Sequence, residues 1–138
     1  MYKLDDILKF VSENTGTDNV TAYSDIDTEL GCTADDFGDL MGAFAKQYKI
    51  DMSTYLWYFH TVEEGHNLSI GRSFYKTPYE LVTRIPVTPG MLLKFAQKGK
   101  WDIIYPEHKI PKRRYDILIN QLLIVGLLLI LICKWLIK

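Results

Sequence analysis

An uncharged apolar stretch near the C-terminus, residues 117–133, places the strongest constraint on how this chain can fold. Thirteen of its 17 residues are Leu, Ile or Val, and only Asn120 and Gln121 are strongly polar. As a helix it would be roughly 25 Å long, and near 30 Å if it continues to Ile137 with Lys134 snorkelling. The stretch is apolar around its whole circumference, which does not suit the core of a globular domain. We therefore predict one transmembrane helix over residues 117–137.

The residues that flank this helix predict its orientation. Four cations precede the span, whereas Lys134 and Lys138 follow it, so the N-terminal side is expected to stay in the cytoplasm. Trp101 and Tyr105, then Tyr115 and Trp135, are candidates for interfacial aromatic residues, although Trp101 suits a domain core equally well. Cations next to the span are expected to contact anionic lipid head groups, at about 1 kcal/mol per charge. The predicted head-group residues are Lys112, Arg113 and Arg114, and the predicted membrane anchors are Ile117, Leu122, Leu127, Leu131 and Trp135.

Charge is divided unevenly along the chain. Residues 1–66 hold 13 acidic residues against 4 lysines, whereas residues 67–138 hold 4 acidic residues against 12 Lys and Arg. This asymmetry indicates an acidic docking face in the first half and a basic membrane-proximal stem in the second; a solvated acidic surface without a partner is the alternative. The basic residues follow no nucleic-acid-binding motif, so lipid explains them better than DNA. We predict a globular domain over residues 1–102 and a basic juxtamembrane linker over residues 103–116.

Apolar periodicity and capping residues predict three helices in the domain. The first covers Leu4 to about Asn14 and ends where Gly16 can adopt the left-handed conformation. The third lies between Thr88 as N-cap and Gly99, with proline at its first position. Residues 54–60 are dense in aromatic side chains and fit neither the helical nor the strand period cleanly, so a short helix and a strand both stay open. Residues 69–75 and 79–85 could pair as a short hairpin.

The second helix is the best marked. Thr33 is its expected N-cap, and Asp35 and Asp36 complement the positive end of the helix dipole. The residues before and through this start read Leu30-Gly31-Cys32-Thr33-Ala34-Asp35-Asp36. One apolar stripe should face the core, formed by Phe37, Leu40, Met41, Phe44 and Tyr48.

This helix start resembles the signature of acyl carrier proteins, in which a leucine-glycine pair precedes an aspartate and the serine that carries phosphopantetheine. Aligned on Leu30-Gly31, Thr33 replaces the aspartate and Ala34 replaces the serine. Residues 27–101 are also similar to a family of small bacterial proteins of unknown function thought to be acyl-carrier-like, with matching pieces at residues 51–53, 88–92 and 99–101. The resemblance implies a mainly α, acyl-carrier-like small helical bundle. The predicted transmembrane helix lies outside the resemblance, and we expect it to span a bacterial inner membrane.

The departure from the signature decides the expected chemistry. Alanine offers no hydroxyl for phosphopantetheine, and nothing in the sequence lowers the pKa of Cys32, which we interpret as a small core residue. No cofactor is therefore expected. In acyl carriers the equivalent helix is an acidic recognition surface, so the resemblance implies that Asp35, Asp36 and Asp39 dock a basic protein partner.

No catalytic constellation is apparent. His60, Glu63, Glu64 and His66 read H-x-x-E-E-x-H, but in a helix His60 and Glu64 would share a face that His66 would not, so we predict no metal site. The chain is best interpreted as a membrane-tethered, non-catalytic adaptor protein. A carrier modified at an unusual site and a small membrane protein of a toxin or effector type are the alternatives.

Overall fold

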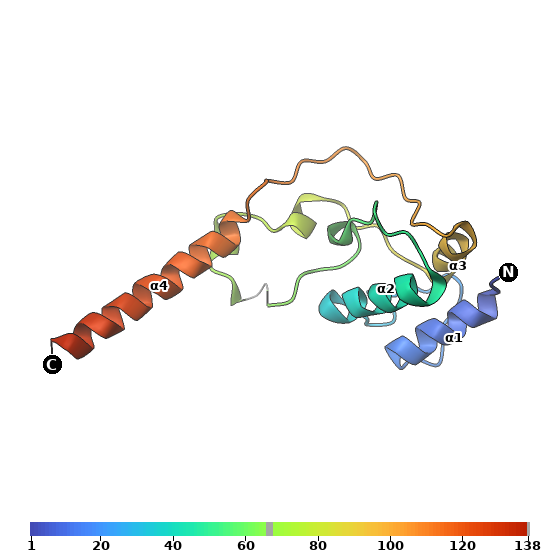
Figure 1. Cartoon of the computed structure of the whole chain (residues 1–138), viewed down its shortest axis with the longest axis horizontal. Coiled ribbons are helices and arrows are strands. Elements are labelled where there is room, and N and C mark those ends of the chain that lie inside the picture. Colours follow the sequence, from blue (N-terminus) through green and yellow to red (C-terminus); the bar gives the residue numbers. More distant parts are fainter. Residues whose placement is uncertain (66–67, 138) are drawn as a thin grey trace.

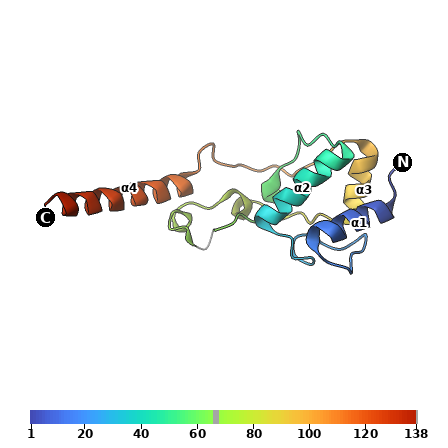
Figure 2. The same cartoon turned by 60° about the horizontal axis from the view of Figure 1, so that its bottom comes forward.

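The computed structural model describes residues 1–65 and 68–137, and it is mainly helical (Figure 1). Three helices pack together: α1 (Leu4–Thr15), α2 (Ala34–Tyr48) and α3 (Pro89–Lys98). Between α2 and α3 the described residues include the short 3-10 turns η1 (Trp57–Phe59), η3 (Gly71–Ser73) and η4 (Pro78–Leu81). The last element, α4 (Tyr115–Leu136), projects away from the rest of the chain (Figures 1 and 2). The described residues contain no β-strand, only an isolated bridge between Asp51 and Lys100.

The helix boundaries follow the local capping rules. Gly16 ends α1 with φ 69°, left-handed as predicted, and Gly99 ends α3 where predicted, with φ 73°. The side chain of Thr88 accepts a hydrogen bond from the amide of Met91, which confirms it as the α3 N-cap. Thr33 does occupy the N-cap position of α2, but its side chain makes no capping hydrogen bond. The hydroxyl of Thr61 accepts the first α2 amide instead, from Ala34 at 2.7 Å.

The hydrophobic core lies among the three packed helices. The predicted stripe of α2 is fully confirmed as buried, and it meets Phe10 of α1 and Leu92 of α3 in one cluster. Each large apolar side chain buried in this way contributes about 1.5–3 kcal/mol relative to exposure. Trp101 belongs to the same core, with 2% of its surface exposed and its ring centroid 4.5 Å from that of Phe95. The interpretation of Trp101 as an interfacial aromatic residue is therefore wrong.

The hairpin predicted for residues 69–75 and 79–85 is also wrong, because these residues form η3 and η4. Pro78 lacks the amide that a strand ladder needs and suits the first position of a helical turn. Glu80 then closes a capping box, since its carboxylate accepts from the amide and the hydroxyl of Thr77 at 2.9 and 2.7 Å. This local arrangement favours the turn over strand pairing.

The aromatic residues 54–60 pack against the segment that follows α3. The His60 side chain is fully buried, and two hydrogen bonds hold its ring in place. Nδ1 donates to the carbonyl of Ile85 and Nε2 accepts from the hydroxyl of Tyr105, both at 2.8 Å. The Tyr105 oxygen in turn accepts from the Trp101 indole N–H at 2.8 Å and the Leu56 amide at 3.2 Å. Tyr105 is thus a structural residue of the domain rather than an interfacial one. The predicted linker is not a free spacer, because its first half lies against the domain.

The first two turns of α4 are joined to the η3 turn. The amide of Gly71 donates to Oδ1 of Asn120 at 2.8 Å, and Nδ2 of Asn120 donates to the Ser69 hydroxyl at 2.9 Å. A Cβ on Gly71 would lie 1.9 Å from the carbonyl oxygen of Asp116, so only glycine permits this approach. α4 begins at Tyr115, within the predicted linker, and its N-terminal end is part of the domain.

Candidate docking site at the start of α2

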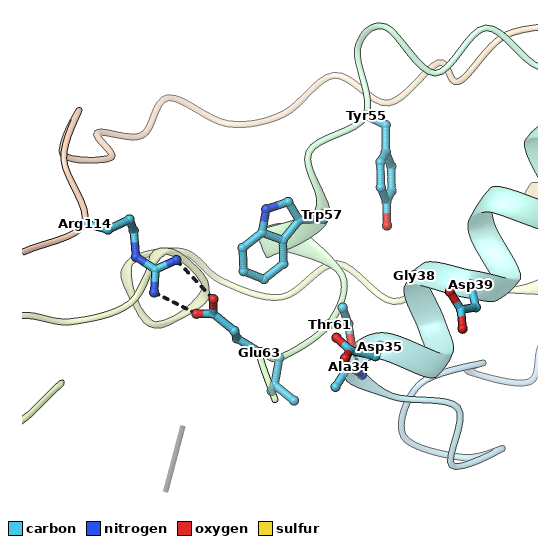
Figure 3. Close-up of a pocket in the computed structure, with 10 residues that line it drawn as sticks. Ala34, Asp35, Gly38, Asp39, Tyr55, Trp57, Thr61, Glu63 and Arg114 are labelled. Carbon is cyan, nitrogen blue, oxygen red and sulfur yellow. Dashed lines mark hydrogen bonds and ion pairs between the residues drawn. The ribbon is translucent and has the colours of Figure 1, made fainter. Parts of the chain in front are cut away.

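A pocket of about 640 Å³ opens beside the N-terminal end of α2 (Figure 3). Trp57 lies between the α2 side of the pocket and the Glu63–Arg114 ion pair, while the Tyr55 side chain points towards α2. The Tyr55 hydroxyl is buried and has no hydrogen-bond partner within the described part of the chain. The pocket is lined by Ala34, Asp35, Gly38, Asp39, Tyr55, Trp57, Thr61, Val62, Glu63 and Arg114.

The three predicted docking residues lie on the first two turns of α2. Asp35, Asp36 and Asp39 are all exposed, and no Lys or Arg in residues 1–65 and 68–137 forms an ion pair with any of them. Asp35 and Asp39 line the pocket, whereas Asp36 lies on the side next to Cys32. A hydrogen bond with Asp35, and then its charge, raises the pKa of the Glu64 carboxyl above its ordinary value. The helix start is therefore a concentrated negative surface.

Ala34, aligned in sequence with the serine of the acyl carrier signature, is held in place by its backbone. Its φ of 54° lies in the left-handed region, which costs a non-glycine residue about 1–2 kcal/mol, and its side chain is buried. The hydrogen bond to Thr61 secures this conformation. Neighbouring Cys32 is buried, and burial followed by the charge of Asp36 raises the pKa of its thiol to about 11. At neutral pH the thiol stays protonated, so it is a poor nucleophile.

Arg114 forms the other wall of the pocket. Its guanidinium donates two hydrogen bonds to Glu63, at 3.2 and 2.8 Å, and two to Asp116, at 2.9 and 2.6 Å. This pairing raises the pKa of Arg114 above its ordinary value. Arg114 was predicted to contact lipid head groups, but the structure commits its donors to these carboxylates. Lys112 and Arg113, by contrast, are exposed.

The predicted membrane anchors all lie on α4 and are exposed. Within the described residues, α4 is the one helix long and apolar enough to cross a membrane, with a mean hydropathy of 2.5 over its most apolar window. Only 6% of that window is buried within the chain, so α4 is not covered as a core helix would be. The exposed anchors are Ile117, Leu122, Leu127, Leu131 and Trp135.

Among the described residues, no histidine belongs to a cluster suited to a metal. His60 is fully buried with both ring nitrogens hydrogen-bonded, and His66 lies outside the described residues. No cluster of three His, Cys, Asp or Glu side chains suited to a metal occurs in the part of the chain that the structure describes.

Sequence reasoning found the acidic residues of the pocket but missed its other walls. Trp57 comes from the aromatic stretch that showed no clear period, and Thr61 directly follows that stretch. Glu63 and Arg114 meet across 51 residues. No local pattern pairs such distant residues.

Residues 5–105 match a family model described as a protein of unknown function (DUF1493). The chain belongs to this family. The match covers the three packed helices apart from Leu4, and it covers the pocket apart from Arg114. α4 lies beyond it. Comparison with curated proteins gives no match, and comparison with solved structures gives none either.

Proposed function

We propose that this DUF1493 protein is a membrane-tethered, non-catalytic, acyl-carrier-like adaptor that docks a basic protein partner through the start of α2. The observation that carries the proposal is the exposure of three carboxylates, Asp35, Asp36 and Asp39, on two turns of one helix without a paired cation in the described residues. Charges that are unpaired within a protein are available to steer and orient a charged partner.

The neighbouring carboxylates make a cation favourable here. Glu64 retains its proton more readily because Asp35 lies beside it, and a lysine or arginine placed between them would remove that repulsion. Arginine would also present a planar fork that suits two carboxylate oxygens. The docking surface therefore selects a partner with clustered positive charge.

The pocket supplies the apolar part of this surface. Trp57 and Tyr55 line it next to Asp35 and Asp39, so a partner could place one apolar side chain against the aromatic rings while its cations meet the acids. Aromatic residues at the centre of an interface commonly carry most of the binding energy. α4, proposed to span the bacterial inner membrane with the domain in the cytoplasm, would keep this surface near the membrane.

The test is capture of partners from native membranes by the full-length chain, with Asp35, Asp36 and Asp39 all changed to lysine. A matched control reverses Asp5, Glu13 and Asp18, three exposed acids in and after α1, and so makes the same change in net charge. We expect the α2 variant to lose the captured protein at least tenfold, and the control to retain it. Both variants should keep the wild-type circular dichroism spectrum.

Equal loss in the two variants would show that net charge alone attracts the partner. If the α2 variant captured as much of the partner as the wild type does, the acidic surface would be only solvent-exposed charge, and the proposal would be overturned. Salt should weaken the wild-type interaction, because exposed charges are screened within about 10 Å at 0.1 M.

A further inference from the structure

Residues 68–81, here called the interfacial segment, expose an unusual number of large apolar side chains. Leu68 is 91% exposed and Phe74 is 71% exposed, although neither lies on α4. Contiguous exposed apolar surface is uncommon on soluble domains and marks a contact with a partner or a membrane. The exposed set in this segment comprises Leu68, Ile70, Phe74, Tyr75 and Leu81.

The position of this segment on the molecule identifies what covers it. Gly71 and Ser69 are hydrogen-bonded to Asn120, and the ring centroid of Tyr75 lies 5.3 Å from that of Tyr115. The segment therefore lies beside the first two turns of α4, at the end of the domain from which that helix leaves (Figures 1 and 2). The exposed apolar residues of α4 include Ile117, close to these contacts in the chain.

We propose that the interfacial segment is a second membrane contact, which inserts its exposed apolar side chains at the boundary between lipid head groups and acyl chains. The proposal rests on α4 spanning the membrane. About 30 Å of apolar helix extends from Ile117 to Ile137, so a bilayer fitted to that length has its boundary at the level of Asp116 and Asn120. Ser69 and Gly71 are hydrogen-bonded to Asn120 and therefore lie at the level of this boundary. Elements that lie at a membrane interface bury their apolar side chains about 5–10 Å deep in it.

Charge and hydrogen bonding fit the same placement. Lys76, Lys112 and Arg113 are exposed near this boundary, where they complement anionic head groups. Asn120 would be costly in the hydrocarbon if unpaired, but its amide is bonded on both sides, to Gly71 and Ser69. With α4 and the segment both held by lipid, the domain has a fixed orientation and presents α2 at a constant height.

The test is nitroxide depth measurement on the full-length chain in vesicles of phosphatidylcholine and phosphatidylglycerol. Cys32 and Cys133 are changed to alanine, and a spin label is attached at one of three single cysteines: Phe74→Cys, Leu127→Cys or Tyr23→Cys. Leu127 reports whether α4 is in the membrane, and Tyr23 is a matched exposed aromatic residue, 89% exposed, between α1 and α2. Collision with oxygen and with a water-soluble nickel chelate gives the depth of each label.

We expect the label at residue 74 to be at least threefold less accessible to the nickel chelate than the label at residue 23, and the label at residue 127 to be deepest. A label at residue 74 as accessible as that at residue 23, with residue 127 in lipid, would overturn the second contact alone. Labels at residues 74 and 127 both in water would show that the membrane anchor itself is wrong. A label at residue 74 that is immobile yet accessible to the chelate would point to a protein contact and would also overturn the proposal.

Discussion

The amide of Gly71 donates a hydrogen bond to the side chain of Asn120 across 49 residues, and this bond ties the domain to its apolar helix. The contact depends on the backbone of residue 71 approaching Asp116 more closely than a side chain would allow. The domain and α4 are therefore one folded unit at this point, rather than two bodies joined by a flexible linker.

Gly71→Ala should separate η3 from α4. The added Cβ would lie 1.9 Å from a carbonyl oxygen, and overpacking of this kind costs about 1–3 kcal/mol. Hydrogen exchange of the amides at residues 69–71 should accelerate while those of α2 stay protected. The control is Gly42→Ala in α2, where nothing lies within 4 Å of the new Cβ and about 0.5–1 kcal/mol of stabilisation is expected. If both substitutions stabilised the protein, the close approach would be wrong.

The full-length chain should resist extraction from membranes by alkaline carbonate, because α4 supplies an apolar span. A chain that ends after Gln121 should be soluble and folded, since it keeps the Asn120 contacts. A chain that ends after Arg114 should also be soluble but less stable, because the bonds from Asn120 contribute about 0.5–1.5 kcal/mol each. Differential scanning calorimetry compares the two truncated chains. Release of the full-length protein by carbonate would contradict the anchor.

His60 should make the domain less stable in mild acid. Burial lowers the pKa of its imidazole below 6.5, so below that pH the unfolded chain binds a proton that the folded chain does not. The contribution that neutral His60 makes to stability is thus fully present above pH 6.5, and it is lost as the pH falls towards the folded pKa. Nitrogen chemical shifts should show that His60 titrates at a lower pH in the folded chain than in the unfolded chain, and that its neutral form carries the proton on Nδ1, where it donates to Ile85. An imidazole that titrates at 6.5 or above would contradict this account of its burial.

Local rules predicted the parts of the fold that depend on neighbouring residues. Thr88 and Gly99 bracket α3, and the stripe of α2 is buried, because capping and helical period act within a few residues. The contacts that sequence reasoning missed join distant residues: Thr61 with Ala34, Glu63 with Arg114, and Gly71 with Asn120. No local sequence pattern predicts such pairs. The hairpin prediction was wrong because the strand pattern of residues 79–85 is weak, and the capping box at Thr77 favours a helical turn there instead.

Co-expression with a phosphopantetheinyl transferase should leave the intact mass of the protein unchanged. Ala34 has no hydroxyl, and the Cys32 thiol, with a pKa of about 11, is protonated at neutral pH. Ala34→Ser should also remain unmodified, since residue 34 is buried and Thr33 replaces the aspartate of the carrier signature. A mass increase on the wild-type chain, mapped to Thr33 or Cys32, would favour a carrier modified at an unusual site.

Stability and the proposed docking should be separable on α2, because its apolar face is buried and its acidic face is exposed. Leu40 is 2% exposed, so Leu40→Ala should cost about 2–5 kcal/mol by opening a cavity in the core. Asp39 is exposed, and Asp39→Lys should cost less than about 1 kcal/mol. Reversing Asp35 and Asp36 adds a helix-dipole penalty of about 0.3–1 kcal/mol each, which a folded domain tolerates.

Urea unfolding of the chain that ends after Gln121 measures these costs without the membrane span. A large loss of stability in Asp39→Lys would mean that the acidic face is structural, and partner capture by charge-reversed variants would then report folding rather than binding. A small loss, together with a large loss in Leu40→Ala, makes any change in capture attributable to the carboxylates themselves.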